Sequence, residues 1–499
     1  MTVWLIILQN ILSDMENSHP TDRALKLIIL SAALAAFMSS LDGTIVNIAL
    51  PTISDIFDLP SSSVSWVSTI YLLVMAGSLL IVGKLTDSIG YRKIFLTGFV
   101  LFTFGSFACG FFPEITGSFG LLLFSRVIQA LGGVMMTIIG PAMLTRYMPG
   151  VRRAKGLSVV ILFASIGMAL GPTLGGLLTE YLSWNWIFYI NVPVGIATLI
   201  LGFFVLPKDN TKPFTLKGFD AAGAVLIFAG LAFLLYAFSE GYNLGWTSVP
   251  ILTCLVLAAA CIAGFLWRET HCTSPILELG LFRNRSFLLL NLVLCLMYFT
   301  LAGAQYLLPF YLQLIKQLST FESGLVLTVM SLGMMASGLL AGQIYAKLVG
   351  KIRVMLLVGI GAIVCGFFLL SNLSPVSGLG IVALGLVLIG FGLGFVTTPA
   401  STLLQGSIHP EKSGMVSSIT SLERFAPMTI GIAFFNTMII VGVKAIAKHT
   451  DITTGPMQDV AANILTSGFD LCFFISMSIA FLAFVICLFV KESRLKPDA

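Results

Sequence analysis

The sequence predicts an all-α integral membrane protein, and two observations carry that prediction. Of its 499 residues 57% are hydrophobic and 10% are charged, with a mean hydropathy of +1.01, whereas soluble domains carry about 25% charged residues. Apolar segments of about 19 residues or more, long enough to cross a bilayer, recur along the whole chain. This pattern predicts that nearly all of the chain is embedded in the membrane and leaves no room for a sizeable soluble catalytic domain.

Fourteen segments satisfy the length requirement. They are 27–49, 64–84, 94–112, 119–144, 156–180, 186–206, 219–239, 248–267, 287–312, 322–346, 353–372, 378–400, 415–441 and 468–490. An even number of spans places both termini on the same side of the membrane. The apolar stretch Met1–Leu12 is too short to span, and it is either an interfacial helix or a segment that precedes a true start at Met15.

The distribution of basic residues predicts the orientation of these fourteen segments in the membrane. Of the 27 Lys and Arg residues, 22 fall in segments assigned to the side of the termini, three fall on the other side, and Arg126 and Arg424 fall within the membrane. Cytoplasmic loops carry an excess of Lys and Arg, so we expect cytoplasmic termini and a multi-pass location in the plasma or inner membrane. The net charge of +5 follows this topology and predicts no nucleic-acid partner.

A weak internal repeat predicts the domain organisation. Gly83–Lys93 ends the second expected helix, and a similar pattern of glycines and basic residues, Gly342–Arg353, ends the tenth. Two six-helix halves built by duplication are typical of transporters. We therefore predict a tail over 1–25, a first half over 26–206, two inserted helices with a linker over 207–286, a second half over 287–490 and a tail over 491–499.

Asp42 is the most informative charge in the chain. It follows the uncharged run Leu27–Leu41 and lies roughly 24 Å along the helix from Lys26 and roughly 13 Å from Pro51. A carboxylate at this depth costs about 2.5–3.5 kcal/mol on insertion scales. The residue is therefore interpreted as a proton or ion site that faces a protein interior; the alternative is a buried aspartate that caps a local bend at Gly43.

Three other intramembrane charges accompany Asp42. Arg126 lies roughly 10 Å below the outer surface, close to the depth of Asp42, so the two can pair; the alternative is an arginine satisfied by backbone carbonyls alone. Glu423 and Arg424 are adjacent in the thirteenth expected helix. Neighbours on a helix point about 100° apart, so we expect one of them to face a central cavity and the other to pack against a neighbouring helix.

The fifth expected helix is rich in small residues, with Gly167, Gly171, Pro172, Gly175 and Gly176. Small residues let helices approach closely, and a proline permits a kink, so this segment is interpreted as a packing face, a hinge or a seal. All four histidines lie in tails or loops, and no catalytic or metal-binding motif is present. The sequence therefore predicts no catalytic residue and no metal site.

Five ordered motifs resemble those of the major facilitator superfamily, specifically its fourteen-helix drug:proton antiporter family, over nearly the whole chain. They are Leu41–Pro51 with Asn47, Gly83–Lys93, the set Arg126, Gln129 and Gly132, Gly167–Gly176, and Trp184–Gly195 with Asn191. In the thirteenth helix Arg424 and Gly431 match the family pattern, whereas Ala426 and Pro427 replace a usual glycine pair. Asn185 also stands where the family usually has arginine.

The resemblance implies transport by alternating access, in which two halves rock around a central cavity. Asp42 would bind the proton, Arg126 would tune its proton affinity, and Glu423 is a further coupling candidate. A gate would be formed by Gly83, Asp87, Gly90 and Arg92, and residues lining the cavity or packing beside it would be Asn47, Gln129, Asn191 and Arg424.

The expected function is proton-driven export of amphipathic or lipophilic small molecules by a monomer in the lipid bilayer, with the proton gradient as the energy source and no cofactor. Two alternatives stay open. One is dedicated export of a single metabolite, siderophore or lipid; the other is a non-transporting membrane enzyme or sensor, against which the lack of a catalytic cluster counts.

Overall fold

The structure is a computed structural model that describes residues 22–147, 150–207, 220–272, 279–347, 352–406, 413–449 and 457–490. Met1–Leu12, most of the 207–217 loop and the tail 491–499 lie outside the described residues. The helices are α2 (Asp22–Phe57), α3 (Ser61–Val64), α4 (Trp66–Ile89), α5 (Tyr91–Thr116), α6 (Phe119–Tyr147), α7 (Gly150–Tyr181), α8 (Trp186–Tyr189), α9 (Asn191–Val205), α10 (Ala221–Leu244), α11 (Val249–His271), the 3-10 helix η1 (Leu279–Arg283), α12 (Arg285–Phe310), the π-helix η2 (Tyr311–Ile315), α13 (Thr320–Lys347), α14 (Ile352–Leu370), α15 (Leu379–Gly406), α16 (Ser413–His449) and α17 (Met457–Cys487).

The all-α membrane fold is confirmed. Fourteen stretches of the described helices are long and apolar enough to cross a membrane, and each coincides with one of the fourteen segments expected from the sequence. Several helices run beyond the expected segment: α2 continues through Pro51 to Phe57 and α16 extends to His449. Hydropathy marks the part of a helix that needs an apolar environment, whereas backbone hydrogen bonding continues into polar flanks.

The same packing pattern occurs in both halves of the bundle. In the first half α2 packs against α7 and α9, and α5 packs against α6 and α9. In the second half α12 packs against α16 and α17, and α14 packs against α15 and α17, at the equivalent places in the span order. The predicted boundaries of the two halves and of the inserted pair stay a prediction.

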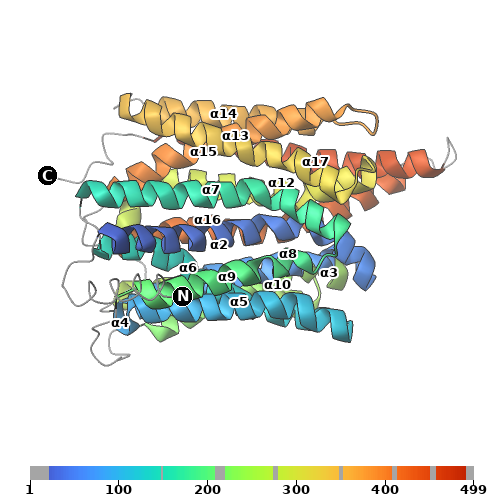
Figure 1. The fold of residues 1–499 in the computed structure, drawn as a ribbon. Helices are drawn as coiled ribbons and strands as arrows, with labels where there is room; N and C mark the ends of the chain where they lie inside the picture. The colour runs from blue at the N-terminus through green and yellow to red at the C-terminus, as the bar shows by residue number, and fades with distance from the viewer. Residues whose placement is uncertain are drawn as a thin grey trace.

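The predicted halves meet most extensively along two helix pairs, and α2 also contacts α12. In Figure 1, α7 runs between α2 and the α13–α15 layer. Extensive contacts join α7 to α13 and α4 to α16. α10, one of the two helices predicted to be inserted, packs against both α4 and α16 as well as against α11, so it touches both predicted halves.

Hydrogen bonds join the halves near one end of the bundle. We call the end at which α2 begins the proximal end, and the end at which α2 finishes the distal end. In the distal part, Tyr306 Oη donates to the Ser61 carbonyl (3.0 Å), Gln313 Nε2 to the Ile48 carbonyl (3.0 Å) and the Phe321 amide to Glu180 Oε2 (2.8 Å), while the hydroxyls of Thr173 and Thr328 lie 2.5 Å apart. We call these contacts the distal seal.

Candidate functional site: a buried ion pair beside a central cavity

Asp42 lies in the middle of an unbroken helix. α2 continues through Asp42 and Gly43 without interruption, so the alternative in which Asp42 caps a bend at Gly43 is wrong. The side chain is fully buried, with 0% of its surface exposed. An ionisable group this deep requires partners, and the neighbouring helices supply them.

Three side chains from two other helices donate to the Asp42 carboxylate. Arg126 Nη1 on α6 lies 2.9 Å from Oδ2, Gln129 Nε2 lies 2.7 Å from Oδ1, and Asn191 Nδ2 on α9 lies 3.2 Å from Oδ1. Gln129 also links the pair to α5, because its Nε2 lies 2.8 Å from Ser106 Oγ. The expected pair is therefore present, and its carboxylate has three donors.

Arg126 pairs with Asp42 and also donates to a backbone carbonyl, so it has both kinds of partner that the sequence suggested. Besides Asp42, its Nη1 donates to Gln129 Oε1 (2.6 Å) and its Nε donates to the Val67 carbonyl on α4 (3.1 Å). The guanidinium carbon stands 4.2 Å from the ring centre of Tyr71 and 5.6 Å from that of Phe188. Backbone, carboxylate and aromatic faces thus hold a cation that is 1% exposed.

This arrangement can act as a protonation switch. A buried ion pair gives up hydration and is stabilised by its mutual attraction and hydrogen bonds, so removing one charge leaves the other uncompensated. Protonation of Asp42 would do this to Arg126 while changing an acceptor into a donor. The helices joined at Asp42, which are α2, α6 and α9, would then have to adjust.

A central cavity of about 180 Å³ lies next to the ion pair and is formed by both halves. Residues on either side of Asp42 line it, including Ser40 and Gly43, but Asp42 itself does not. Tyr71 lies between them: it lines the cavity, and its hydroxyl is near Ser39 and Asp42 but makes no hydrogen bond of ordinary geometry to any described residue. The proton-binding candidate is therefore one side chain away from the cavity.

The structure assigns different surroundings to the adjacent charges of α16. Arg424 lines the cavity and stands 5.4 Å from the ring centre of Phe425. Glu423 is not among the described lining residues; it is 5% exposed, is within electrostatic range of Cys295 and Tyr298 on α12, and neither of its oxygens has a hydrogen-bond partner among the described residues. Of the two, Arg424 is the one that faces the cavity.

The other residues named from the sequence lie in the same half. Asn47 accepts a hydrogen bond from Ser68 Oγ (2.8 Å) and ties α2 to α4 rather than lining the cavity. Gly83 lies in α4, and Gly90, at φ 106°, is the single residue between α4 and α5. Arg92 Nη2 donates to the Phe203 carbonyl (2.7 Å) on α9. The side chain of Asp87 lies outside the described part of the structure, so the gate stays a prediction.

The glycine motif of the fifth span, α7, has two faces. Gly167, Gly171 and Gly175 meet α2, where an added methyl group would clash with backbone or side-chain atoms of Phe37, Thr44 and Ile45. Gly176 instead meets the backbone of Thr320 and Phe321 in the second half, and the Pro172 carbonyl meets Gly324. The helix is unbroken at Pro172. One motif therefore supplies both the packing face and part of the distal seal.

Two residues of the site were not anticipated from the sequence. Tyr71 and Ser106 lie in apolar helices with no charge nearby in the sequence, and a tyrosine or serine there is ordinary. Gln129 was expected only to line the cavity or pack beside it, although it lies three residues after Arg126 and so on the same helix face. That spacing is a signal that could have placed it on Asp42.

The described part of the chain has fourteen helices able to span a membrane, a cavity between two similarly packed groups of helices and a buried ion pair beside that cavity, and these features are typical of a membrane transporter. The sequence model of the Major Facilitator Superfamily matches residues 32–432. The chain belongs to this superfamily.

Named relatives agree with that assignment, and a solved structure has the same fold. The chain is 32% identical to the multidrug resistance protein Stp of Mycobacterium tuberculosis (strain CDC 1551 / Oshkosh), over 85% of this chain and 78% of the relative. It is 30% identical to the riboflavin transporter RibZ of Clostridioides difficile (strain 630), over 90% of this chain and 97% of the relative. The fold resembles the crystal structure of a D-xylose-proton symporter, with a TM-score of 0.63 at 14% identity and coverage of 95% of this chain and 99% of that one.

Proposed function

We propose that this protein is a proton-coupled antiporter that exports amphipathic or lipophilic small molecules by alternating access. The observation that carries the proposal is the Asp42–Arg126 ion pair, buried at 0% and 1% exposure beside a cavity built by both halves. An ionisable group within the membrane marks a proton or ion pathway by default. The relative Stp bears a multidrug-resistance name, which supports drugs as substrates.

In this proposal the structure represents the state whose distal side is closed. The distal seal holds the halves together, and the cavity extends from Tyr71 and Phe425 toward residues nearer the proximal end, such as Ala32 and Val160. Three donors surround the Asp42 carboxylate here, which is the arrangement that suits its charged form. In the state open to the outside Asp42 would take up a proton. On return to this state the same three donors would bind the carboxylate again and the proton would leave on the inner side, so that inward proton movement drives export.

The orientation and the energy source belong to the same proposal. The basic-residue bias supports cytoplasmic termini, which makes the distal end extracellular and the location the cell membrane. A proton gradient replaces any cofactor, the transporter acts as a monomer, and it carries out no enzymatic reaction. Thiol labelling of intact cells tests the orientation: Cys272, at the proximal end of α11, should stay unlabelled, and a cysteine replacing the exposed Thr116 at the distal end of α5 should react. Labelling of Cys272 under those conditions would reverse the orientation.

Dedicated export of one metabolite is the second candidate. The resemblance to a protein named as a riboflavin transporter, at 30% identity over 97% of that relative, favours it. A substrate panel distinguishes the candidates, because a multidrug exporter transports several unrelated compounds and a dedicated one transports a single chemical type.

Asp42→Asn tests the coupling role, because the amide retains size and polarity but cannot ionise. In everted vesicles with an imposed pH gradient, we expect the variant to lose uphill accumulation of every compound that the parent transports, and to lose the accompanying proton movement. Asp55→Asn, on the same helix but exposed, is the matched control and should behave as the parent does. Uphill transport with normal proton movement in Asp42→Asn would remove Asp42 as the coupling site.

A further inference from the structure

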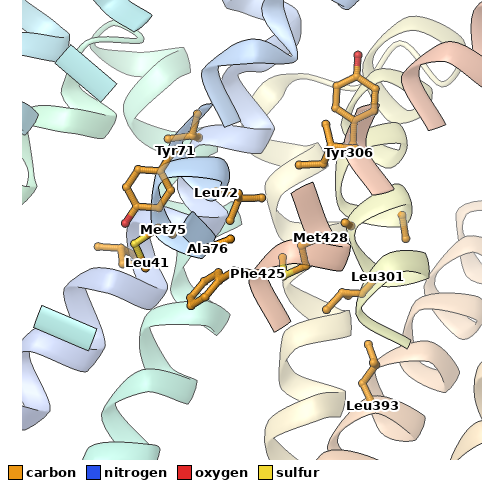
Figure 2. Packing of buried hydrophobic residues seen from close by; sticks show 14 of the residues in the cluster. Leu41, Tyr71, Leu72, Met75, Ala76, Leu301, Tyr306, Leu393, Phe425 and Met428 are labelled. Carbon is orange, nitrogen blue, oxygen red and sulfur yellow. The ribbon is translucent and has the colours of Figure 1, made fainter. Parts of the chain in front are cut away.

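The described lining of the central cavity is rich in methionine and aromatic side chains. Figure 2 shows side chains of α4 and α16 converging here, with Phe425 reaching toward Met75 and Ala76. Thioether side chains are flexible and polarisable, and they pack well against aromatic rings. Five methionines and three aromatic residues line the cavity: Met75, Met136, Met168, Met334, Met428, Tyr71, Tyr298 and Phe425. A lining of this kind can accommodate flat aromatic ligands that differ in size and shape.

The charge of this lining has one sign. Arg424 is the one charged side chain among the described residues that line the cavity. Its guanidinium stands over the Phe425 ring at 5.4 Å, and no described residue forms an ion pair or accepts a hydrogen bond from it. Guanidinium groups match carboxylate and phosphate geometry through paired N–H donors, so these donors are available to a ligand.

The nearby carboxylates do not neutralise Arg424. Asp42 is fully buried and engaged by Arg126, Gln129 and Asn191, with Tyr71 between it and the cavity. Glu423 is not among the described lining residues; it is within electrostatic range of Cys295 and of the lining residue Tyr298 on α12, and its two oxygens have no hydrogen-bond partner among the described residues. An isolated buried carboxylate takes up a proton rather than remain charged. The cavity therefore carries a net positive charge.

We propose that the cavity selects flat aromatic amphipaths that carry an anionic group, with Arg424 as the residue that binds this group. The ring system would lie among the methionines and Phe425, and a carboxylate or sulfonate would accept two hydrogen bonds from the guanidinium. A cation of the same shape would meet an unpaired positive charge. The inference rests on the proposed function only in taking this cavity as the transport site.

The test measures equilibrium binding to the purified full chain in lipid nanodiscs, with no gradient present. The probes are three naphthalenes of nearly equal size: 2-naphthoate, 2-naphthamide and 2-naphthylmethylammonium. Isothermal titration calorimetry should rank them in that order, with naphthoate bound at least tenfold more tightly than naphthamide. Equal affinities, the reverse order or no binding of naphthoate would overturn the proposal without any variant having to fold.

Two variants then locate the charge. Arg424→Gln should reduce naphthoate affinity to that of naphthamide while changing naphthamide affinity less than twofold, and Arg424→Lys should retain part of the preference. Arg285→Gln, which removes an exposed arginine outside the cavity, is the matched control and should leave the ranking intact. An unchanged preference for naphthoate in folded Arg424→Gln would reject Arg424 as its binding residue.

These outcomes are independent of proton coupling. If naphthoate is preferred but the pH gradient drives no transport in vesicles, the antiporter proposal fails and the ligand class stands. If gradient-driven export is found without any preference for the anionic probe, the ligand class fails and the antiporter proposal stands.

Discussion

Replacing Gly176 by alanine should open the distal seal. A methyl group on Gly176 would lie 2.5 Å from the Thr320 carbonyl oxygen and 2.8 Å from Phe321 Cα. Both are backbone atoms of the opposite half, so no side-chain rotation relieves the clash. Overpacking of this kind costs about 1–3 kcal/mol, and the cost disappears when the halves separate at this end. A difference of that size changes the ratio of the two states by roughly 5- to 150-fold.

Disulfide cross-linking across the seal measures this shift. Thr173 and Thr328 are close enough, with hydroxyls 2.5 Å apart, for cysteines at both positions to meet the geometric requirement of a disulfide. In a background in which the eight native cysteines are replaced by alanine, the Thr173→Cys/Thr328→Cys pair should cross-link rapidly under mild oxidation. Adding Gly176→Ala should slow cross-linking by at least fivefold.

Gly120→Ala is the matched control for that experiment. Gly120 lies near the distal end of α6, and a methyl group there would meet nothing closer than Ser118 Oγ at 3.7 Å, so the cross-linking rate should not change. If a folded Gly176→Ala protein cross-links as fast as the parent, the close contact with Thr320 does not hold the distal side shut, and the interpretation of α7 as part of a seal is wrong.

Two further changes test the site and the inserted helices. Tyr71→Phe retains the ring over Arg126 but removes the hydroxyl that lies near Ser39 and Asp42. We expect this variant to move protons about tenfold more slowly in vesicles, as measured with a pH-sensitive dye, and to bind ligand as the parent does. Loss of ligand binding would contradict a role confined to proton movement. Asp220→Ala removes the carboxylate that caps α10 at the Gly223 amide and pairs with Arg268, which should destabilise the protein by roughly 1–2 kcal/mol. Although burial acts to raise it, hydrogen bonds from Gly223 and Arg268 hold the pKa of Asp220 below its usual range, so this stability is present above the ordinary aspartate pKa and is lost as the pH falls through the lowered one. The difference in melting temperature between parent and variant should accordingly shrink below about pH 4, and a constant difference would count against the ion pair as its cause.

The sequence predicted the ion pair because depth in a membrane can be counted. Along a helix each residue advances about 1.5 Å, so Asp42 and Arg126 could be assigned similar depths from their distances to the ends of their segments. Composition and the number of apolar segments were enough for the all-α membrane class, because a bilayer permits few alternatives to helices, whereas the major-facilitator arrangement was expected from the resemblance of the motifs. Neither the depth of a residue nor the number of helices depends on the rotational orientation of each helix about its axis.

The sequence could not predict the rotational orientation of each helix, that is, which of its side chains face which neighbouring helix. Glu423 and Arg424 are neighbours, and only the packing of α16 against α4 and α12 determines that Arg424 lines the cavity and Glu423 does not. Asn191 reaches Asp42 because α9 packs against α2, a contact between residues 149 positions apart. Tyr71 could not be anticipated either, since an aromatic residue in an apolar helix carries no mark of its neighbours.

The proposed proton site, Asp42, and the distal seal are joined by close packing through α2 and α7. Asp42 faces Arg126, while Thr44, half a turn away, both lines the cavity and packs against Gly171 of α7. Five residues further along α7, Gly176 meets the opposite half at Thr320. Because close-packed interiors transmit small displacements, movement of α2 on protonation of Asp42 acts at the cavity wall and at the seal together. A lone carboxylate with room around it could change its charge without this consequence. In the proposed mechanism, the close contact between α2 and α7 at the motif glycines would couple proton binding to the conformation.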